Sequence, residues 1–88
     1  MNIEIITLGN ELLSGKTINL NATYLSKTLL KAGYRTNYIS VYPDDKKEIQ
    51  KGIKLSLDRA EIIIITGGLG PTLDDNTKKI VSDLLKIP

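Results

Sequence analysis

Residues 62–75 read IIIITGGLGPTLDD, and this stretch both indicates the fold and suggests a site. The unbroken run of four isoleucines suits a strand covered on both faces, so we predict a strand in the middle of a sheet. Three glycines follow, Gly67, Gly68 and Gly70, which allow positive φ and let another group approach the backbone closely. A buried strand that ends in such a loop is typical of a parallel α/β sheet with a ligand site at the strand end.

The rest of the chain alternates between strand and helix patterns. Short runs of β-branched and aromatic residues predict strands, and apolar residues spaced by three and four predict helices. The predicted strands are 2–8, 35–42 and 62–66, and the predicted helices extend from Asn19 to Gly33, over 46–59 and over 76–86. This βαβαβα order predicts a three-layer α/β fold with a mainly parallel sheet. Three strands make a small sheet, so we expect residues 1–88 to form a single, incomplete domain.

Composition excludes several kinds of function. The net charge of +2 comes from 12 basic and 10 acidic residues spread along the chain, which argues against nucleic acid as a partner. The chain has no histidine and no cysteine, so it cannot use histidine bases, cysteine nucleophiles or zinc-thiolate sites. We find no apolar run long enough to span a membrane and no secretory signal pattern, and therefore expect a cytoplasmic protein.

Polar or glycine-rich residues follow all three predicted strands. They are Gly9-Asn10-Glu11, Pro43-Asp44-Asp45 and the glycine loop that begins after Thr66. Because ligands bind beyond the carboxyl ends of parallel strands, we expect these three segments to form one rim, with glycine amides holding a phosphate. The glycine loop lacks the lysine of a nucleotide P-loop and has Leu73 where a dinucleotide fingerprint needs glycine.

Carboxylates beside a phosphate cradle would suit Mg²⁺ or a similar hard cation. Each acid also has a simpler interpretation. Asp74 and Asp75 could cap the last helix, Asp44 could be a turn residue, and Glu11 could be a solvated charge. Asp45 is a candidate helix cap, and so are Asn19 and Asn21.

The combined motifs resemble a known family. TGGLGPT at 66–72, followed by Asp74, Asp75 and Thr77, is similar to the signature loop of CinA-type (competence/damage-inducible) proteins. Their N-terminal domain belongs to the molybdopterin-binding superfamily of MoaB, MogA and gephyrin. GNELLSG at 9–15, with Asn19 and Asn21 after it, resembles the CinA branch in particular. So do Leu69, where the adenylyltransferases typically have threonine, and the second acid at 74. The chain looks like the first half of the family domain.

This resemblance implies a ligand and a set of site residues. Domains of the CinA branch are associated with hydrolysis of ADP-ribose that depends on a divalent cation, Mg²⁺, Mn²⁺ or Co²⁺. The alternatives are molybdopterin binding in molybdenum cofactor biosynthesis and a non-catalytic binding or assembly module; a homo-oligomer is expected in the complete protein. The implied catalytic residues are Asp44 and Asp75, the implied phosphate or nucleotide contacts are Thr66, Gly67, Gly68, Gly70, Glu11 and Asn21, and the implied metal ligands are Asp75 and Asp74.

Overall fold

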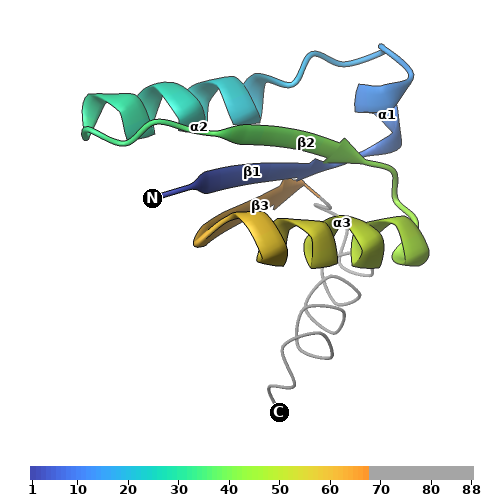
Figure 1. Ribbon diagram of the computed structural model, residues 1–88. Helices are drawn as coiled ribbons and strands as arrows, with labels where there is room; N and C mark the ends of the chain where they lie inside the picture. Colours follow the sequence, from blue (N-terminus) through green and yellow to red (C-terminus); the bar gives the residue numbers. More distant parts are fainter. Residues whose placement is uncertain (68–88) are drawn as a thin grey trace.

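The structure, a computed structural model, describes residues 1–67. Its elements are β1 (Ile3–Leu8), α1 (Asn10–Leu13), α2 (Leu20–Lys31), β2 (Tyr38–Tyr42), α3 (Lys46–Arg59) and β3 (Ile62–Gly67). All pairings are parallel, in the order β2-β1-β3. Helix α2 lies on one face of the sheet and α3 on the other (Figure 1), so the predicted three-layer fold is confirmed for this part of the chain. The predicted helix at 76–86 lies outside the described residues. Within residues 1–67, no helix is long and apolar enough to cross a membrane.

Most predicted boundaries agree with the structure, and the differences have local causes. Helix α3 has the predicted bounds, and the Asp45 side chain caps it by accepting a hydrogen bond from the Lys47 amide (3.1 Å). Strand β2 begins three residues later than expected. Just before it, the Asn37 amide donates to Ile3 O and the Asn37 side-chain oxygen accepts from the Ile3 amide, both at 2.8 Å. The four-residue helix α1 was not predicted, because one turn is too short to show a periodic pattern.

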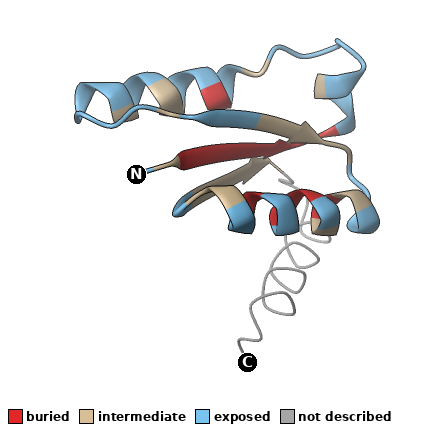
Figure 2. Cartoon of the chain, in the orientation of Figure 1, coloured by how far each residue is buried: buried red, intermediate tan, exposed pale blue. Residues whose placement is uncertain are grey.

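The central strand of the described sheet is β1, which corrects the prediction that the isoleucine run 62–66 is central. All six residues of β1 are buried, whereas β3 is mostly half-buried and Ile62 is exposed (Figure 2). The sequence of β1 obscures this position because it contains Glu4 and Thr7, which are unusual in a strand that is covered on both faces. Both side chains are satisfied by tertiary hydrogen bonds.

The two faces of β1 pack against different helices. On the α3 side, Ile6 and Leu8 form the main apolar cluster with Ile49 and Ile53. The alternation of a strand places Ile3, Ile5 and Thr7 on the opposite side, which α2 covers and where Ala22 is buried. Tyr42, Ile63 and Ile65 extend the cluster on the α3 side. The core therefore follows β1 on both faces.

Glu4 is a buried carboxylate with a complete set of partners. Arg59, in the last turn of α3, donates from Nε to Oε1 (2.9 Å) and from Nη2 to Oε2 (2.8 Å). Ser40 Oγ donates to Oε2 at 2.6 Å. Burial by itself would raise the pKa of Glu4, but the hydrogen bonds from Arg59 and Ser40 outweigh it and hold this pKa below its ordinary value. The guanidinium also stacks on Tyr38, 4.2 Å from the ring centroid.

Strand β3 ends in close contact with β1. Gly67 has φ +104°, and a Cβ at this position would collide with the Leu8 carbonyl oxygen and lie 2.9 Å from the Leu8 nitrogen. Both the conformation and the space therefore require glycine at the start of the glycine loop, which confirms the prediction for this residue. Gly68 and Gly70 lie outside the described residues.

Replacing Arg59 by methionine should destabilise the protein more than breaking an exposed ion pair does, since it leaves the buried Glu4 carboxylate without its cation. Lys51→Met is the control, because Lys51 pairs with Glu48 at 3.9 Å on the exposed side of α3 and should cost less than about 1 kcal/mol. Urea denaturation measures both values. An equal effect of the two variants would contradict the assigned importance of the buried pair.

The same comparison should depend on pH in a defined direction. Because the pKa of Glu4 is lowered in the folded state, the pair stabilises the protein above the ordinary value of 4.5 and loses this effect as the pH falls through the folded value. The difference between wild type and Arg59→Met should therefore shrink in acid. If the stability difference between wild type and Arg59→Met grows as the pH falls, folding does not lower the pKa of Glu4.

Gly67→Ala should destabilise the protein more than Gly33→Ala. Both glycines have positive φ, at +104° and +94°, so both substitutions carry the same kind of backbone penalty, about 1 to 2 kcal/mol. Only at Gly67 does the added methyl group also meet backbone, because nothing lies within 4 Å of the corresponding position at Gly33. Thermal unfolding of the two variants measures the extra cost, and equal Tm values would contradict the close approach of β3 to β1.

Candidate functional site

A hollow of about 350 Å³ lies at the carboxyl ends of β1 and β3. Four segments meet there: the end of β1 with α1, the loop before α2, the first turn of α2, and the end of β3. Its place agrees with the rule that predicted a site beyond the strand ends. The lining residues are Thr7, Leu8, Glu11, Leu12, Thr17, Ile18, Asn19, Leu20, Asn21, Thr66 and Gly67.

Four of the predicted ligand contacts lie in this hollow. Glu11 comes from α1, Asn21 from the first turn of α2, and Thr66 and Gly67 from the end of β3. Residues far apart in the sequence are thus brought to one place by the parallel sheet. The remaining predicted contacts, Gly68 and Gly70, and the predicted metal and catalytic residues Asp74 and Asp75, lie outside the described residues.

Asp44 lies at the same end of the sheet but does not line the hollow. Its side chain is exposed, and its amide donates to Asn10 Oδ1 at 3.0 Å. The Gly9 amide donates to Tyr42 O at 3.0 Å, so two hydrogen bonds join the segment after β1 to the end of β2 and to the loop after it. The predicted rim of three strand ends is therefore partly formed, with Asp44 at the same edge of the sheet but not in the hollow.

Asn19 caps α2 and joins this helix to the sheet. Its Oδ1 accepts from the Ala22 amide (3.4 Å), and its Nδ2 donates to Thr7 Oγ1 (3.0 Å). Thr7 Oγ1 in turn donates to the Ser40 carbonyl oxygen at 3.3 Å. Of the two candidate caps, Asn19 is confirmed, and Asn21 lies two residues further along the chain with its side chain exposed.

The sequence did not identify Thr7 as a site residue. In the parallel pairing of β1 with β3, Thr7 lies opposite Thr66, so the two hydroxyl side chains are next to each other on one face of the sheet. The sequence does contain a feature that could have identified Thr7: like Thr66, it is a polar residue that follows isoleucines near the carboxyl end of a strand. The sequence also did not identify the apolar wall of the hollow, which includes Leu12, Ile18 and Leu20.

Helix α1 and the loop after it hold Glu11 in place. The Glu11 carbonyl oxygen accepts from the amides of Lys16 (3.0 Å) and Thr17 (3.2 Å), so the loop folds back over α1. The Glu11 carboxylate lies over Gly9, where Oε1 is 2.6 Å from the position that a Cβ would occupy. Glycine at position 9 therefore makes room for this carboxylate beside the end of β1.

In the described part of the chain, residues 1–67, the lining of the hollow includes one acid, Glu11, and no lysine or arginine. From these residues a phosphate could be stabilised by backbone amides, hydroxyls or a bound cation. Among residues 1–67, no three acidic side chains come together in a way that could hold a metal ion. The oxygen groups that the described residues supply, one carboxylate with hydroxyls and amides, are of the kind that hard cations prefer.

Comparison with known proteins identifies the family. Residues 4–88 match the sequence family described as "Probable molybdopterin binding domain". A competence-damage inducible protein of Bacillus mycoides is 47% identical over 85 residues, which are 97% of this chain and 21% of the relative. One from Halothermothrix orenii is 41% identical over 88 residues, or 100% of this chain and 21% of the relative. The chain thus spans about a fifth of the length of these curated relatives.

Two solved structures share the fold. A crystal structure of the protein CinA from Thermoplasma acidophilum, described as of unknown function, has a TM-score of 0.85 and 35% identity, covering 97% of this chain and 50% of that one. The molybdopterin biosynthesis enzyme MoaB of Thermus thermophilus has a TM-score of 0.79 and 22% identity, covering 94% of this chain and 54% of that one. At that identity the second likeness shows the fold alone.

These matches agree with the geometry of the described residues, in which a parallel sheet carries a hollow with polar and apolar walls at its carboxyl edge. They also agree with the family expected from the glycine loop and from the GNELLSG stretch. The chain belongs to the molybdopterin-binding domain family, and within it the chain is similar to the CinA-type competence-damage inducible proteins.

Proposed function

We propose that this domain binds a small molecule that carries a phosphate or pyrophosphate, and that the complete protein hydrolyses ADP-ribose with a divalent cation. The observation that supports the proposal is the convergence of Glu11, Asn21, Thr66 and Gly67 on one hollow. The volume of about 350 Å³ is at the lower end of the range for small-molecule sites.

In this proposal the phosphate lies at the β3 end of the hollow. Gly67 begins the glycine loop there, with its backbone held against Leu8. Backbone amides of Gly67, Gly68 and Gly70 would donate to phosphate oxygens, since the described lining offers no lysine or arginine for this purpose. Thr66, which stands next to Thr7, adds a hydroxyl donor at the same end.

In this proposal the aspartates hold the metal ion and orient the attacking water. Asp75 and Asp74 follow the glycine loop in the sequence, and Asp44 comes from the loop after β2 at the same edge of the sheet. Carboxylates are suitable ligands for Mg²⁺, Mn²⁺ or Co²⁺, and a bound ion of this kind polarises a phosphoryl oxygen and lowers the pKa of bound water. We propose that Asp75 holds the ion, with Asp74 as a weaker ligand, and that Asp44 orients the water.

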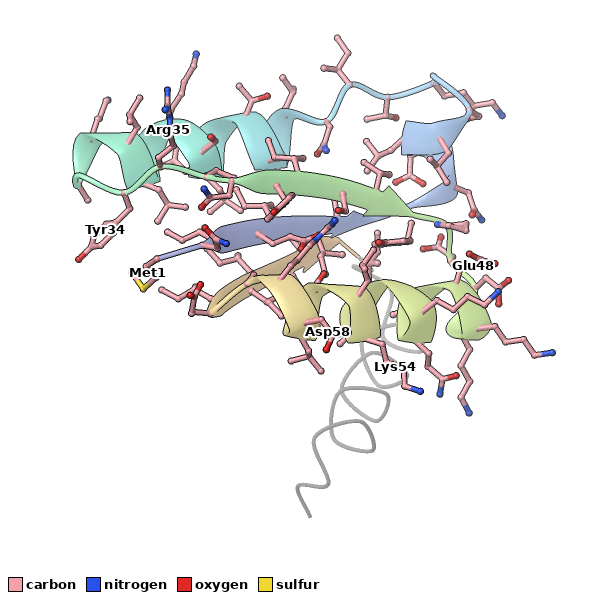
Figure 3. The ribbon with its side chains drawn as sticks, in the orientation of Figure 1. Met1, Tyr34, Arg35, Glu48, Lys54 and Asp58 are labelled. Carbon is pink, nitrogen blue, oxygen red and sulfur yellow. The ribbon has the colours of Figure 1, made fainter. Side chains whose placement is uncertain are left out.

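The full-length gene product should release AMP from ADP-ribose in the presence of Mg²⁺, Mn²⁺ or Co²⁺, as measured by chromatography. Asp75→Asn should lower the rate by about 100-fold or more, because it removes a charged group from the reacting centre. Asp58→Asn is the control: Asp58 lies on the outer side of α3, away from the sheet (Figure 3), and its loss should leave the rate unchanged. Absence of AMP with all three metals would exclude the hydrolase, and full activity of Asp75→Asn would exclude the assigned site.

A second candidate function is molybdopterin binding. The observation that favours it is the family match over residues 4–88, since the family is described by this ligand. A pterin would use the same phosphate position and would place its ring in the rest of the hollow, against Leu12, Ile18 and Leu20.

The cytoplasmic location and the self-association of the complete protein remain predictions.

Competition between the two ligands separates these functions. With the full-length protein in EDTA, ADP-ribose should bind more tightly than molybdopterin, because the hydrolase has to hold both phosphates of the pyrophosphate. Isothermal titration calorimetry with each ligand measures the two affinities. Tighter binding of molybdopterin would favour the second candidate, and no binding of either ligand would favour a non-catalytic assembly module.

A further inference from the structure

The polar side chains that line the hollow fall into two groups. Thr7 and Asn19 are used in internal hydrogen bonds: Thr7 donates to Ser40 O and accepts from Asn19, whose own oxygen accepts from the Ala22 amide. The side chains of the second group make no hydrogen bond with any other described residue. They are Glu11, Thr17, Asn21 and Thr66. Residues 1–67 therefore leave the hydrogen-bonding capacity of the second group open to a ligand.

Glu11 is the one charged member of this group. Within residues 1–67 its carboxylate has no ion pair, and its position over Gly9 places it beside the end of β1. A carboxylate accepts hydrogen bonds and cannot donate them, so in the absence of a bound cation a ligand group that binds to it must supply donors. It also repels the phosphate groups of a ligand, and among residues 1–67 no lysine or arginine lines the hollow to compensate. The part of the ligand near Glu11 is therefore uncharged and rich in donors.

The ligand class of the proposed function offers two uncharged parts, a nucleobase and a ribose. An adenine ring presents a single amino group as donor, and its ring nitrogens would face the carboxylate as acceptors. The vicinal 2′ and 3′ hydroxyls of a ribose present two adjacent donors, which match the two oxygens of one carboxylate. Acidic side chains bind ribose hydroxyls in this way in other open α/β sheets.

We propose that Glu11 is a specificity-determining residue that accepts hydrogen bonds from the vicinal hydroxyls of a ribose in the ligand. Asn21, exposed in the first turn of α2, lines the same hollow and supplies both a donor and an acceptor to the sugar. The ribose lies between the phosphate position near Gly67 and the apolar wall. This inference rests on the proposed nucleotide binding, and it favours ribonucleotide ligands over pterins, which lack this diol.

Calorimetry with the full-length protein in EDTA tests the inference, with ADP and 2′,3′-dideoxy-ADP as probes. Wild type should bind ADP about tenfold or more tightly than the dideoxy nucleotide, as expected for hydrogen bonds to a charged acceptor. Glu11→Gln should reduce this ratio to about twofold, because the neutral amide offers one acceptor oxygen in place of two charged ones. Glu48→Gln, on α3 and outside the hollow, is the control and should keep the wild-type ratio.

The possible outcomes separate the inference from the proposed function. Equal affinity of wild type for the two nucleotides would overturn the ribose contact while leaving nucleotide binding in place. Tighter binding of both nucleotides by Glu11→Gln, with an unchanged ratio, would show that Glu11 faces the phosphates and would also overturn it. If wild type binds neither nucleotide, the proposed function and the inference fail together. The comparison in wild type needs no substitution, so it does not depend on the folding of a variant.

Discussion

The described structure depends on the burial of β1 together with its two polar side chains. A central strand needs apolar cover on both faces, and β1 obtains it from α2 and α3. Glu4 and Thr7 would each make this burial unfavourable if they lacked partners. Arg59 and Ser40 satisfy the first, and Asn19 and Ser40 satisfy the second. Because these partners come from different elements, the polar groups of one strand hold both helices and the neighbouring strand.

The two polar residues have different consequences for function. Glu4 lies near the amino end of β1, where its pair with Arg59 anchors the last turn of α3. Thr7 lies near the carboxyl end, where its hydrogen bond with Asn19 holds the first turn of α2 beside the hollow. The amino end of β1 therefore contributes to the stability of the fold. Its carboxyl end positions the first turn of α2, which would contact a ligand.

Much of the candidate site could be predicted, because loops that follow parallel strands converge by topology. Glu11, Thr66 and Gly67 were assigned to one rim from strand order, and Asn21 to the ligand from the family resemblance; the structure brings the four together. Asp44 was assigned in the same way, yet its side chain is exposed and does not line the hollow. Strand order shows which edge a residue reaches, but the direction of its side chain depends on loop contacts such as the bond from the Asp44 amide to Asn10.

The sequence alone determined the order of strands and helices, the cap at Asp45, the need for glycine at 67 and the family. Each of these follows from local chemistry: apolar spacing, a short side chain that can cap a helix, and a backbone with no Cβ. Only the tertiary structure decided which strand is central in the described sheet. The isoleucine run of β3 was the more hydrophobic candidate, but β1 takes the central position since Arg59 and Asn19, distant in sequence, satisfy its polar side chains. Hydrophobic pattern measures how readily a strand can be buried, whereas its place in the sheet also depends on partners that only the fold brings together.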